Sequence, residues 1–469
     1  MAKPFDAPRP VEYPDKPAAI KKPKGSRGGV LPPGPRQLLG VLTIKFLLDT
    51  PNFLLSLHKE YGDAASFSLS GELFIAFFTP EAVTDVLVKK QHEFVKGVGF
   101  ERMHKVLGQG LLTNEEPVHL RHRRMMQPPF HHGQLDSYAA QMRNVVTDHL
   151  STWKLGQQLS ATDEMMQLTF KIVAQILFST NIEKYAAGVQ HHMGIAIDRI
   201  ERTMLPGLDR FDNFPLPYFR KFRESANYLA DVAQDIIESR VASGTNGDDL
   251  LGLLLSARDD ENQPFSQDDV RDETLTLILS GHETTANATT WALAYLRDRD
   301  DLWMKLALEA EQNLPENSLP DVKRVLSAPT AKAIFAEALR LAPPVWVSPR
   351  RALSDVEIGG IAVPKGAHVL VSQYASHRSE KFFHNPDKFL PERWENDFES
   401  SLPRGAYFPF LLGSRKCLGD QFALLEANII LLQMAREKRL RPISAQVPKA
   451  EPRATYRPKG GVPSLVTTN

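Results

Sequence analysis

The sequence predicts a mainly α-helical fold with small β-sheets, in the α+β class. Three observations indicate this. Most of the chain between about residues 50 and 345 has the apolar spacing of amphipathic helices. The segment from Ser266 to Asp298 is long and apolar enough to be a buried central helix. After residue 345, two short apolar runs around Gly359-Gly360 predict strands, and an apolar helix follows near the C-terminus.

Composition excludes several classes of protein. The chain has 469 residues, of which 42% are hydrophobic and 24% charged, as in ordinary globular proteins. Its formal net charge is zero, so we expect no nucleic-acid partner, because such a partner normally requires a basic excess. The single cysteine, Cys417, excludes internal disulfides and metal sites built from several cysteines.

The N-terminal region divides at about residue 30. Residues 1–30 are rich in proline and lysine and predict a flexible tail, whereas residues 31–469 predict one domain. The tail lacks the apolar core of a secretory signal, so we expect a soluble, cytoplasmic protein. The segment from Leu38 to Leu57 is apolar, but Lys45, Asp49 and Pro51 interrupt it, which predicts a helix rather than a membrane span. A peripheral membrane contact stays open.

The predicted central helix begins with a capping signal and carries polar groups in its middle. Ser266 and Asp269 have the spacing of a capping box. Further along, buried Glu and Thr within Ser280–Thr285 would be costly and call for a function. The His282-Glu283 pair is not a zinc-protease motif, because that motif needs a second histidine at position 286, which is Ala.

Cys417 lies in an unusual segment, between two glycines and beside two cations. Gly413 and Gly419 permit tight turns, and Arg415 and Lys416 would lower the pKa of a nearby thiol. The apolar helix that follows places the sulfur near a helix N-terminus, which also favours a thiolate. Two roles fit a single stabilised thiolate: a nucleophile, which would need a histidine base, or the one axial ligand of a metal.

The spacing Phe-x-x-Gly-x-Arg-x-Cys-x-Gly resembles the haem-binding loop of the cytochrome P-450 family. Its fixed positions are Phe410, Gly413, Arg415, Cys417 and Gly419. The resemblance covers about residues 31 to 460 and makes residues 31–469 the single catalytic domain. It implies the P-450 fold with the long helix over the haem. It also implies haem b (iron protoporphyrin IX) with Cys417 as axial thiolate, and dioxygen as co-substrate.

Other motifs of the family occur in the same order. Glu337 and Arg340 lie one helical turn apart and, with Arg393, match the family's buried brace behind the cysteine loop. Glu283 and Thr284 match its acid–alcohol pair, which relays protons to the oxygen site.

Ser280 and Gly281 match the small residues that leave room above the iron, where the family's helix is locally loosened. Ser280 replaces the usual alanine. Its hydroxyl would either bond back to Thr276 or face the oxygen pocket.

The resemblance also implies haem-propionate ligands and an apolar substrate pocket. His119 and Arg123 share a helical face, and Arg350 and Arg415 match further propionate positions, with Arg351 as a competitor for Arg350. By contrast, His131-His132 and His191-His192 are interpreted as surface pairs. The residues that match pocket walls are Phe100, Met103, Leu107, Leu111, Leu112, Leu277, Val345, Trp346 and Val347.

The implied function is a haem-thiolate monooxygenase that inserts one atom of dioxygen into a C–H bond of an apolar substrate. Fatty acids, terpenoids and carotenoids fit this description. Electrons would come from a separate ferredoxin or flavodoxin, docked near Arg415 and Lys416. Three alternatives remain at this point: a peroxygenase, which would typically lack the Glu283-Thr284 pair; a haem-based sensor or carrier; and a cysteine hydrolase.

Overall fold

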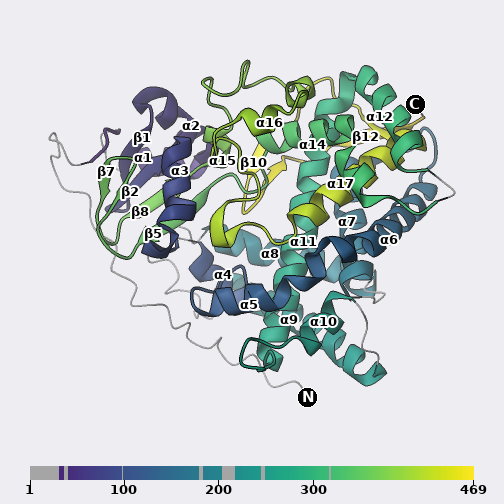
Figure 1. The fold of residues 1–469 in the computed structure, drawn as a ribbon, viewed down its shortest axis with the longest axis horizontal. Helices are drawn as coiled ribbons and strands as arrows, with labels where there is room; N and C mark the ends of the chain where they lie inside the picture. Colours follow the sequence, from purple (N-terminus) through teal and green to yellow (C-terminus); the bar gives the residue numbers. More distant parts are fainter. Residues whose placement is uncertain are drawn as a thin grey trace.

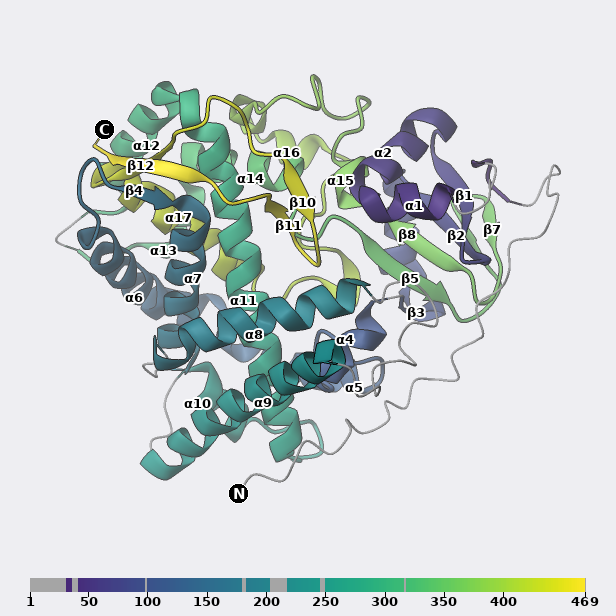
Figure 2. The same ribbon diagram turned by 180° about the vertical axis from the view of Figure 1, so that it is seen from behind.

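The computed structural model confirms a mainly helical fold with small sheets (Figures 1 and 2). It describes residues 31–35, 41–97, 99–178, 183–202, 217–244, 249–315 and 318–468. The tail predicted for residues 1–30 lies outside these ranges. The helices are α1 (Val41–Leu48), α2 (Thr50–Tyr61), α3 (Pro80–Thr84), α4 (Phe100–Leu107), α5 (Val118–Met126), α6 (His132–Ser151), α7 (Ala161–Phe178), α8 (Glu183–Arg202), α9 (Pro217–Ser243), α10 (Leu250–Ser256), α11 (Gln267–Tyr295), α12 (Asp300–Asn313), α13 (Val322–Ser327), α14 (Pro329–Leu341), α15 (Gln373–Ser376), α16 (Phe398–Ser401) and α17 (Asp420–Arg436).

The strands form one larger sheet and three small ones. The five-stranded sheet has the order β1-β2-β8-β5-β3 and lies to one side of the helices (Figure 1). Its strands are β1 (Ala64–Leu69), β2 (Glu72–Phe77), β3 (Phe94–Lys96), β5 (Ser348–Ala352) and β8 (His368–Val371). The small sheets pair β4 (Gln158–Ser160) and β9 (Arg439–Pro442) with β12 (Pro463–Thr467), β6 (Val356–Ile358) with β7 (Ile361–Val363), and β10 (Ala450–Pro452) with β11 (Tyr456–Pro458).

Most of residues 50–345 is helical, as predicted, but the sequence analysis did not identify the strands β1, β2, β3 and β4 within this range. Both faces of β1 and β2 are covered, since every residue of β1 and all but the first of β2 are buried. Strands buried on both faces lack the alternation of apolar and polar residues that identifies a strand from sequence. The strands predicted around Gly359-Gly360 are confirmed as β6 and β7.

The predicted central helix is confirmed as α11, which runs through the middle of the helical part (Figures 1 and 2). Its capping box is complete: the Ser266 hydroxyl accepts from the Asp269 amide at 3.1 Å, and the Asp269 carboxylate accepts from the Ser266 amide at 3.0 Å. Helices α7, α9 and α14 and strand β11 pack around α11. This enclosure explains why most of the 29 residues of the helix are buried, polar ones such as Asn287 and Thr290 included.

The apolar segment near the N-terminus forms two helices rather than one. Asp49 ends α1 and caps α2, where its carboxylate accepts from the Asn52 amide at 3.2 Å. The inner face of α1 places Phe46 edge-on against Phe53, with ring centroids 5.7 Å apart. Its outer face exposes three apolar side chains at helical spacing, Ile44, Leu47 and Leu48. None of the helices in the described ranges is long and apolar enough to cross a membrane.

Candidate cofactor and active site

The segment before α17 holds Cys417 in a tight loop. The Cys417 amide donates to the Phe410 carbonyl at 2.8 Å, which closes the loop. Gly413 has φ of +74°, and a Cβ there would lie 1.9 Å from the Leu87 carbonyl oxygen, so only glycine fits. Gly419 has an ordinary φ of −96°, so of the two glycines only Gly413 adopts the left-handed conformation. Its amide instead faces the Cys417 sulfur.

The expectation of a lowered thiol pKa at Cys417 is wrong for the protein alone. Part of the side chain is accessible, but the surrounding protein withdraws the thiol from bulk water, and this desolvation raises its pKa to about 11. The Gly419 amide, Arg123 and Lys416 offset only part of the effect. A thiol that is protonated at neutral pH is a weak nucleophile, whereas a metal cation deprotonates a coordinating thiol directly.

The middle of α11 carries one accessible patch on an otherwise buried helix. Between Asp272 and Ala294, the residues that are not buried are Ser280, Gly281 and Thr284. Their spacing places them on one helical face. An added Cβ at Gly281 would lie 3.1 Å from Val173 Cγ2, so the small residue also lets α11 approach α7 closely. The small residues predicted for this stretch therefore lie on an accessible face of α11. The hydroxyls of Ser280 and Thr284 make this face polar.

Side chains in this stretch bond back to helix carbonyls. Ser280 Oγ donates to the Thr276 carbonyl at 2.6 Å, which decides between the two positions expected for this hydroxyl. Thr284 Oγ1 donates in the same way to the Ser280 carbonyl at 2.8 Å. The expected loosening of the helix is not observed, because α11 is uninterrupted from Gln267 to Tyr295. The extra donors supplement the helical hydrogen bonds instead of replacing them.

Glu283 and Thr284 each bond a different partner. The Glu283 carboxylate is buried, with the residue 7% exposed, and its Oε1 accepts from Thr455 Oγ1 at 2.6 Å. Thr455 Oγ1 in turn accepts from Asn287 Nδ2 at 3.0 Å. Thr455 lies in the turn between β10 and β11, 172 residues from Glu283. Sequence reasoning missed Thr455, because no local pattern connects that turn to α11.

Two cations face each other across neighbouring strands beside the loop that follows α4. In the antiparallel pair β3–β5, Lys96 is directly opposite Arg350, and both are buried at 5% and 6% exposure. Like charges directly opposite each other destabilise a sheet. Burial lowers the pKa of Lys96 well below its usual value and that of Arg350 to about 10, and the charge of Arg415 adds to both effects.

The charges around this pair do not cancel. Arg415 pairs with Glu115 and donates to the Asn114 carbonyl at 3.0 Å, and Lys96 Nζ donates to the same carbonyl at 2.6 Å. Among the described residues, no carboxylate pairs with Arg350. Glu115 and the buried Glu273 both lie near enough to Lys96 to act against the lowering of its pKa. Arg350 is therefore the cation of this cluster that is left without a paired carboxylate among the described residues, and an anionic ligand would stabilise it.

The register of β5 decides between the two neighbouring arginines. Arg350 points to the Lys96 side, whereas Arg351 is opposite Val95 and His368, on the other face, where Glu72 is the nearest opposite charge. Arg350 therefore belongs to the cationic cluster and Arg351 does not. Sequence reasoning found Arg350 and Arg415 but missed Lys96 and Glu115, which only the sheet register brings to the cluster.

His119 and Arg123 share one face of α5, as predicted, but both already have partners in the protein. His119 Nδ1 contacts Glu116 Oε1 at 2.9 Å, and burial lowers the pKa of His119 to about 4. A neutral His119 that donates from Nδ1 presents only an acceptor at Nε2, so it must be protonated to donate to a carboxylate. Arg123 Nη1 donates to the Lys416 carbonyl at 2.7 Å, next to Cys417.

The brace behind the cysteine loop has the predicted composition. The Glu337 carboxylate, which is fully buried, accepts from Arg340 at 2.9 Å on both oxygens and from Arg393 Nε at 3.1 Å. Trp394 Nε1 and the Leu390 amide also donate to it, each at 2.9 Å. Burial raises the pKa of Glu337, but these hydrogen bonds and the two arginine charges outweigh burial and lower it.

The residues matched to substrate-pocket walls divide into two groups. Phe100 and Met103 on α4, Leu111 and Leu112 after it, and Val345 and Val347 before β5 are half-buried. Leu107, Leu277 and Trp346 are buried, and Leu107 has no exposed surface at all. The Trp346 indole donates from Nε1 to the Arg453 carbonyl at 2.9 Å, so the turn that carries Thr455 also contacts this side chain.

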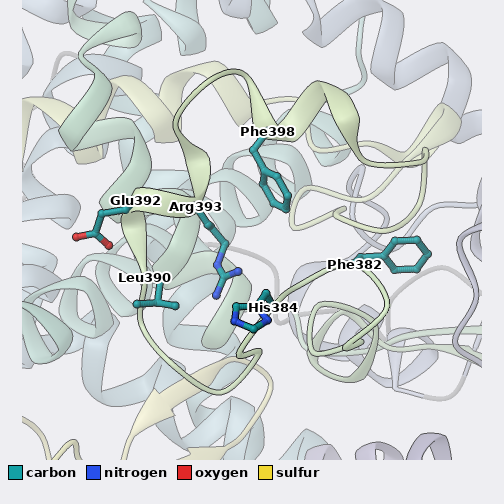
Figure 3. Close-up of a pocket in the computed structure, with 6 residues that line it drawn as sticks. All are labelled: Phe382, His384, Leu390, Glu392, Arg393 and Phe398. Atoms are coloured by element: carbon teal, nitrogen blue, oxygen red, sulfur yellow. The ribbon is translucent and has the colours of Figure 1, made fainter.

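A separate cavity of about 390 Å³ lies beside the brace (Figure 3). Its lining comes from one segment, residues 382–398, and includes Arg393 of the brace but neither Cys417 nor the accessible face of α11. We assign it no part in the site. His131 and His191 are exposed, as predicted for surface residues, and His192 is bonded to Ser225, whereas the side chain of His132 is not among those that the structure describes. Within the described ranges, no group of three or more His, Cys, Asp or Glu side chains could hold a metal ion.

These features together fit a metal cofactor that carries two carboxylates. The protein supplies one accessible cysteine, an accessible face on a buried helix, and a cluster of three cations in which Arg350 has no paired carboxylate among the described residues. Haem b has an iron for the cysteine and two propionates for the cations. The fold and the site therefore fit the class of helical haem proteins in which a single cysteine is the protein ligand of the iron.

Comparison with known proteins identifies the family. The family model for cytochrome P450 matches residues 32–462, so the chain belongs to the cytochrome P450 family and is a P450 monooxygenase. A relative named cyclooctatin synthase, from Streptomyces melanosporofaciens, is 32% identical over 420 residues, covering 89% of each chain. Pentalenene oxygenase of Streptomyces avermitilis is 29% identical over 414 residues, covering 88% of this chain and 90% of its own.

A solved structure confirms the fold. The crystal structure of the cytochrome P450DA heme domain superimposes with a TM-score of 0.84 at 24% sequence identity. The match covers 94% of this chain and 99% of the other. The alternative of a cysteine hydrolase is therefore wrong.

Proposed function

We propose that this P450 monooxygenase is a haem-thiolate enzyme that hydroxylates a terpenoid-type substrate. The observation that carries the cofactor assignment is the buried pair Lys96 and Arg350, in which Arg350 has no paired carboxylate among the described residues, together with an accessible Cys417. Cys417 would be the axial ligand. Lys96, Arg350 and Arg415 would hold the propionates, with His119 and Arg123 at the edge of the cluster.

When bound, the haem supplies activation of dioxygen, and the cysteine thiolate favours cleavage of the O–O bond. The protein's own residues hold and move protons. Glu283 is a buried carboxylate next to the accessible face of α11, and Thr284 places a hydroxyl on that face. We propose that Glu283 supplies protons and that Thr284 passes them to the oxygen site. This pair favours a monooxygenase over a peroxygenase.

The proposed substrate class depends on the apolar walls and on the relatives. Met103, Leu111, Leu112 and Val347 are partly buried and pack against the main hydrophobic core. Two relatives have names that give their substrates, cyclooctat-9-en-7-ol and pentalenene. We infer from both that a compact cyclic terpenoid is a better substrate than a fatty acid or a carotenoid.

The substrate proposal is tested by adding cyclic terpenoids, fatty acids and carotenoids to the holoenzyme. We expect binding of the cyclic terpenoids to shift the Soret band, and the terpenoids to gain one oxygen atom on turnover, which mass spectrometry detects. A shift and product with fatty acids but with no terpenoid would contradict the substrate class and leave the monooxygenase assignment intact.

The proposed electron donor is a separate acidic protein that docks near Cys417. Arg124 and Lys416 are well exposed on this side, with side chains 61% and 49% accessible. Both already pair with acids, Arg124 with Asp260 at 2.9 Å and Lys416 with Asp420 at 2.6 Å. The positive charges of Arg124 and Lys416 are therefore partly neutralised by these two aspartates, which the sequence alone does not show. A carboxylate of the partner protein would have to compete with the aspartates for the two cations.

A further inference from the structure

The turn between β10 and β11 carries a polar side chain into the core beside α11. Thr455 is 8% exposed, and its hydroxyl lies between Glu283 Oε1, at 2.6 Å, and Asn287 Nδ2, at 3.0 Å. Asn287 is fully buried, and Glu283 is 7% exposed. A buried carboxylate is costly unless hydrogen bonds satisfy it, so this contact contributes to holding Glu283 in place.

The direction of the two hydrogen bonds follows from the number of hydrogens available. A threonine hydroxyl has one hydrogen and two lone pairs. The Asn287 amide N–H occupies a lone pair of Thr455 Oγ1, so the single hydrogen is free to point at Glu283 Oε1. The chain from Asn287 through Thr455 to Glu283 therefore delivers a hydrogen-bond donor to the carboxylate and fixes its orientation.

The same turn is tied to the elements that would surround a substrate. Arg453 pairs with Asp198 of α8 at 3.0 Å, and its carbonyl accepts from the indole of Trp346 at 2.9 Å. On the far side of Thr455, the Tyr456 amide donates to the Pro344 carbonyl at 3.0 Å. The turn thus bridges α8, the segment before β5 and the acid on α11.

We propose that Thr455 is a positioning residue for Glu283, and that the turn Arg453–Thr455 holds this carboxylate where it can supply protons to the oxygen site. The inference rests on the proposed role of Glu283. It adds that the orientation of the acid is set from outside α11, by a turn anchored to α8 and Trp346. Thr455 itself transfers no proton to the substrate.

The first test needs no turnover and uses a double-mutant cycle on thermal unfolding of the haem-loaded protein. Thr455→Val and Glu283→Leu each break the contact, so we expect the double variant to lower the melting temperature by less than the sum of the single variants. Thr289→Val is the matched control, because Thr289 is a fully buried threonine on α11 whose hydroxyl has no described partner. Additive effects of Thr455→Val and Glu283→Leu would overturn the proposal.

The second test measures product formed per electron consumed. We expect Thr455→Val to lower this ratio about tenfold, Thr455→Ser to restore it, and Glu283→Gln to lower it at least as much. In Thr455→Val, the lower yield of product per electron should be accompanied by a larger solvent isotope effect. A loss of packing alone would not enlarge the isotope effect. If Glu283→Gln is impaired while Thr455→Val behaves as wild type, the positioning role is wrong. If Glu283→Gln itself behaves as wild type, the proposed role of Glu283 is wrong.

Discussion

Lys96 and Arg350 are buried cations directly opposite each other on neighbouring strands, an arrangement that an anionic ligand would stabilise. We predict that Lys96→Met or Arg350→Met speeds haem loss to an acceptor apoprotein about tenfold, because each removes a charged donor to a propionate. Without haem, Arg350→Met should be at least as resistant to urea as the wild type, since it relieves the repulsion between Arg350 and Arg415. Arg351→Met is the control, because Arg351 lies on the opposite face of β5. Equal effects of Arg351→Met and Arg350→Met would contradict this account.

Glu337 makes a second residue-scale prediction, about stability and pH. We expect Glu337→Gln to lower the free energy of unfolding by about 3 kcal/mol, because it leaves Arg340 buried without its counter-charge. The folded protein lowers the pKa of Glu337, so the carboxylate stabilises the wild type at neutral pH and this contribution is lost as the pH falls through the lowered value. Urea denaturation between pH 7 and acidic pH measures both, and an unchanged pH dependence in the variant would contradict the assignment.

Sequence reasoning found the site residues that lie close together in the chain. The cysteine loop and the Glu337–Arg340 pair were predictable, because loop turns and helical faces are set by local spacing. Lys96, Glu115 and Thr455 were not. Lys96 reaches the cluster through the β3–β5 register, and Thr455 reaches Glu283 across 172 residues. The raised pKa of Cys417 could not be predicted either, because it results from desolvation by distant parts of the folded chain.

Helix α1 has its apolar face outward, which is unusual for a surface helix. We predict that Leu47→Ser with Leu48→Ser lowers binding to anionic lipid vesicles about tenfold in a sedimentation assay, because both side chains would enter the lipid interface. Leu308→Ser on α12 is the control, since Leu308 is also exposed, at 60%. No vesicle binding by the wild type, or equal losses in the control, would contradict a peripheral membrane contact at α1.

At the scale of elements, the long helix was predictable and the main sheet was not. The capping box and the apolar length identified α11 within three residues of its observed end. Strands β1 and β2 are covered on both faces, so their sequences lack a period of two, and β3 is only three residues long. The family's loosened helix was expected by resemblance, whereas the hydroxyls of Ser280 and Thr284 here bond to an uninterrupted helix.

The surface around the cysteine loop makes a whole-molecule prediction about electron transfer. Arg124→Glu with Lys416→Glu should raise the KM for an acidic ferredoxin about fivefold, because both positions would then repel its carboxylates. Salt should raise the wild-type KM in the same direction. Arg220→Glu is the control, since Arg220 is an exposed arginine on α9, also paired with an acid. Insensitivity to both salt and the charge reversals would contradict docking at this face.

In the whole molecule, we propose that the cysteine loop, the cationic cluster and the accessible face of α11 together hold one haem. The absorption spectrum of the reduced, carbon monoxide-bound protein tests this, with Cys417→Ala measured beside the wild type. We expect a long-wavelength Soret band, characteristic of thiolate ligation, that disappears in the variant. A protein without haem, or a spectrum unchanged by Cys417→Ala, would contradict it.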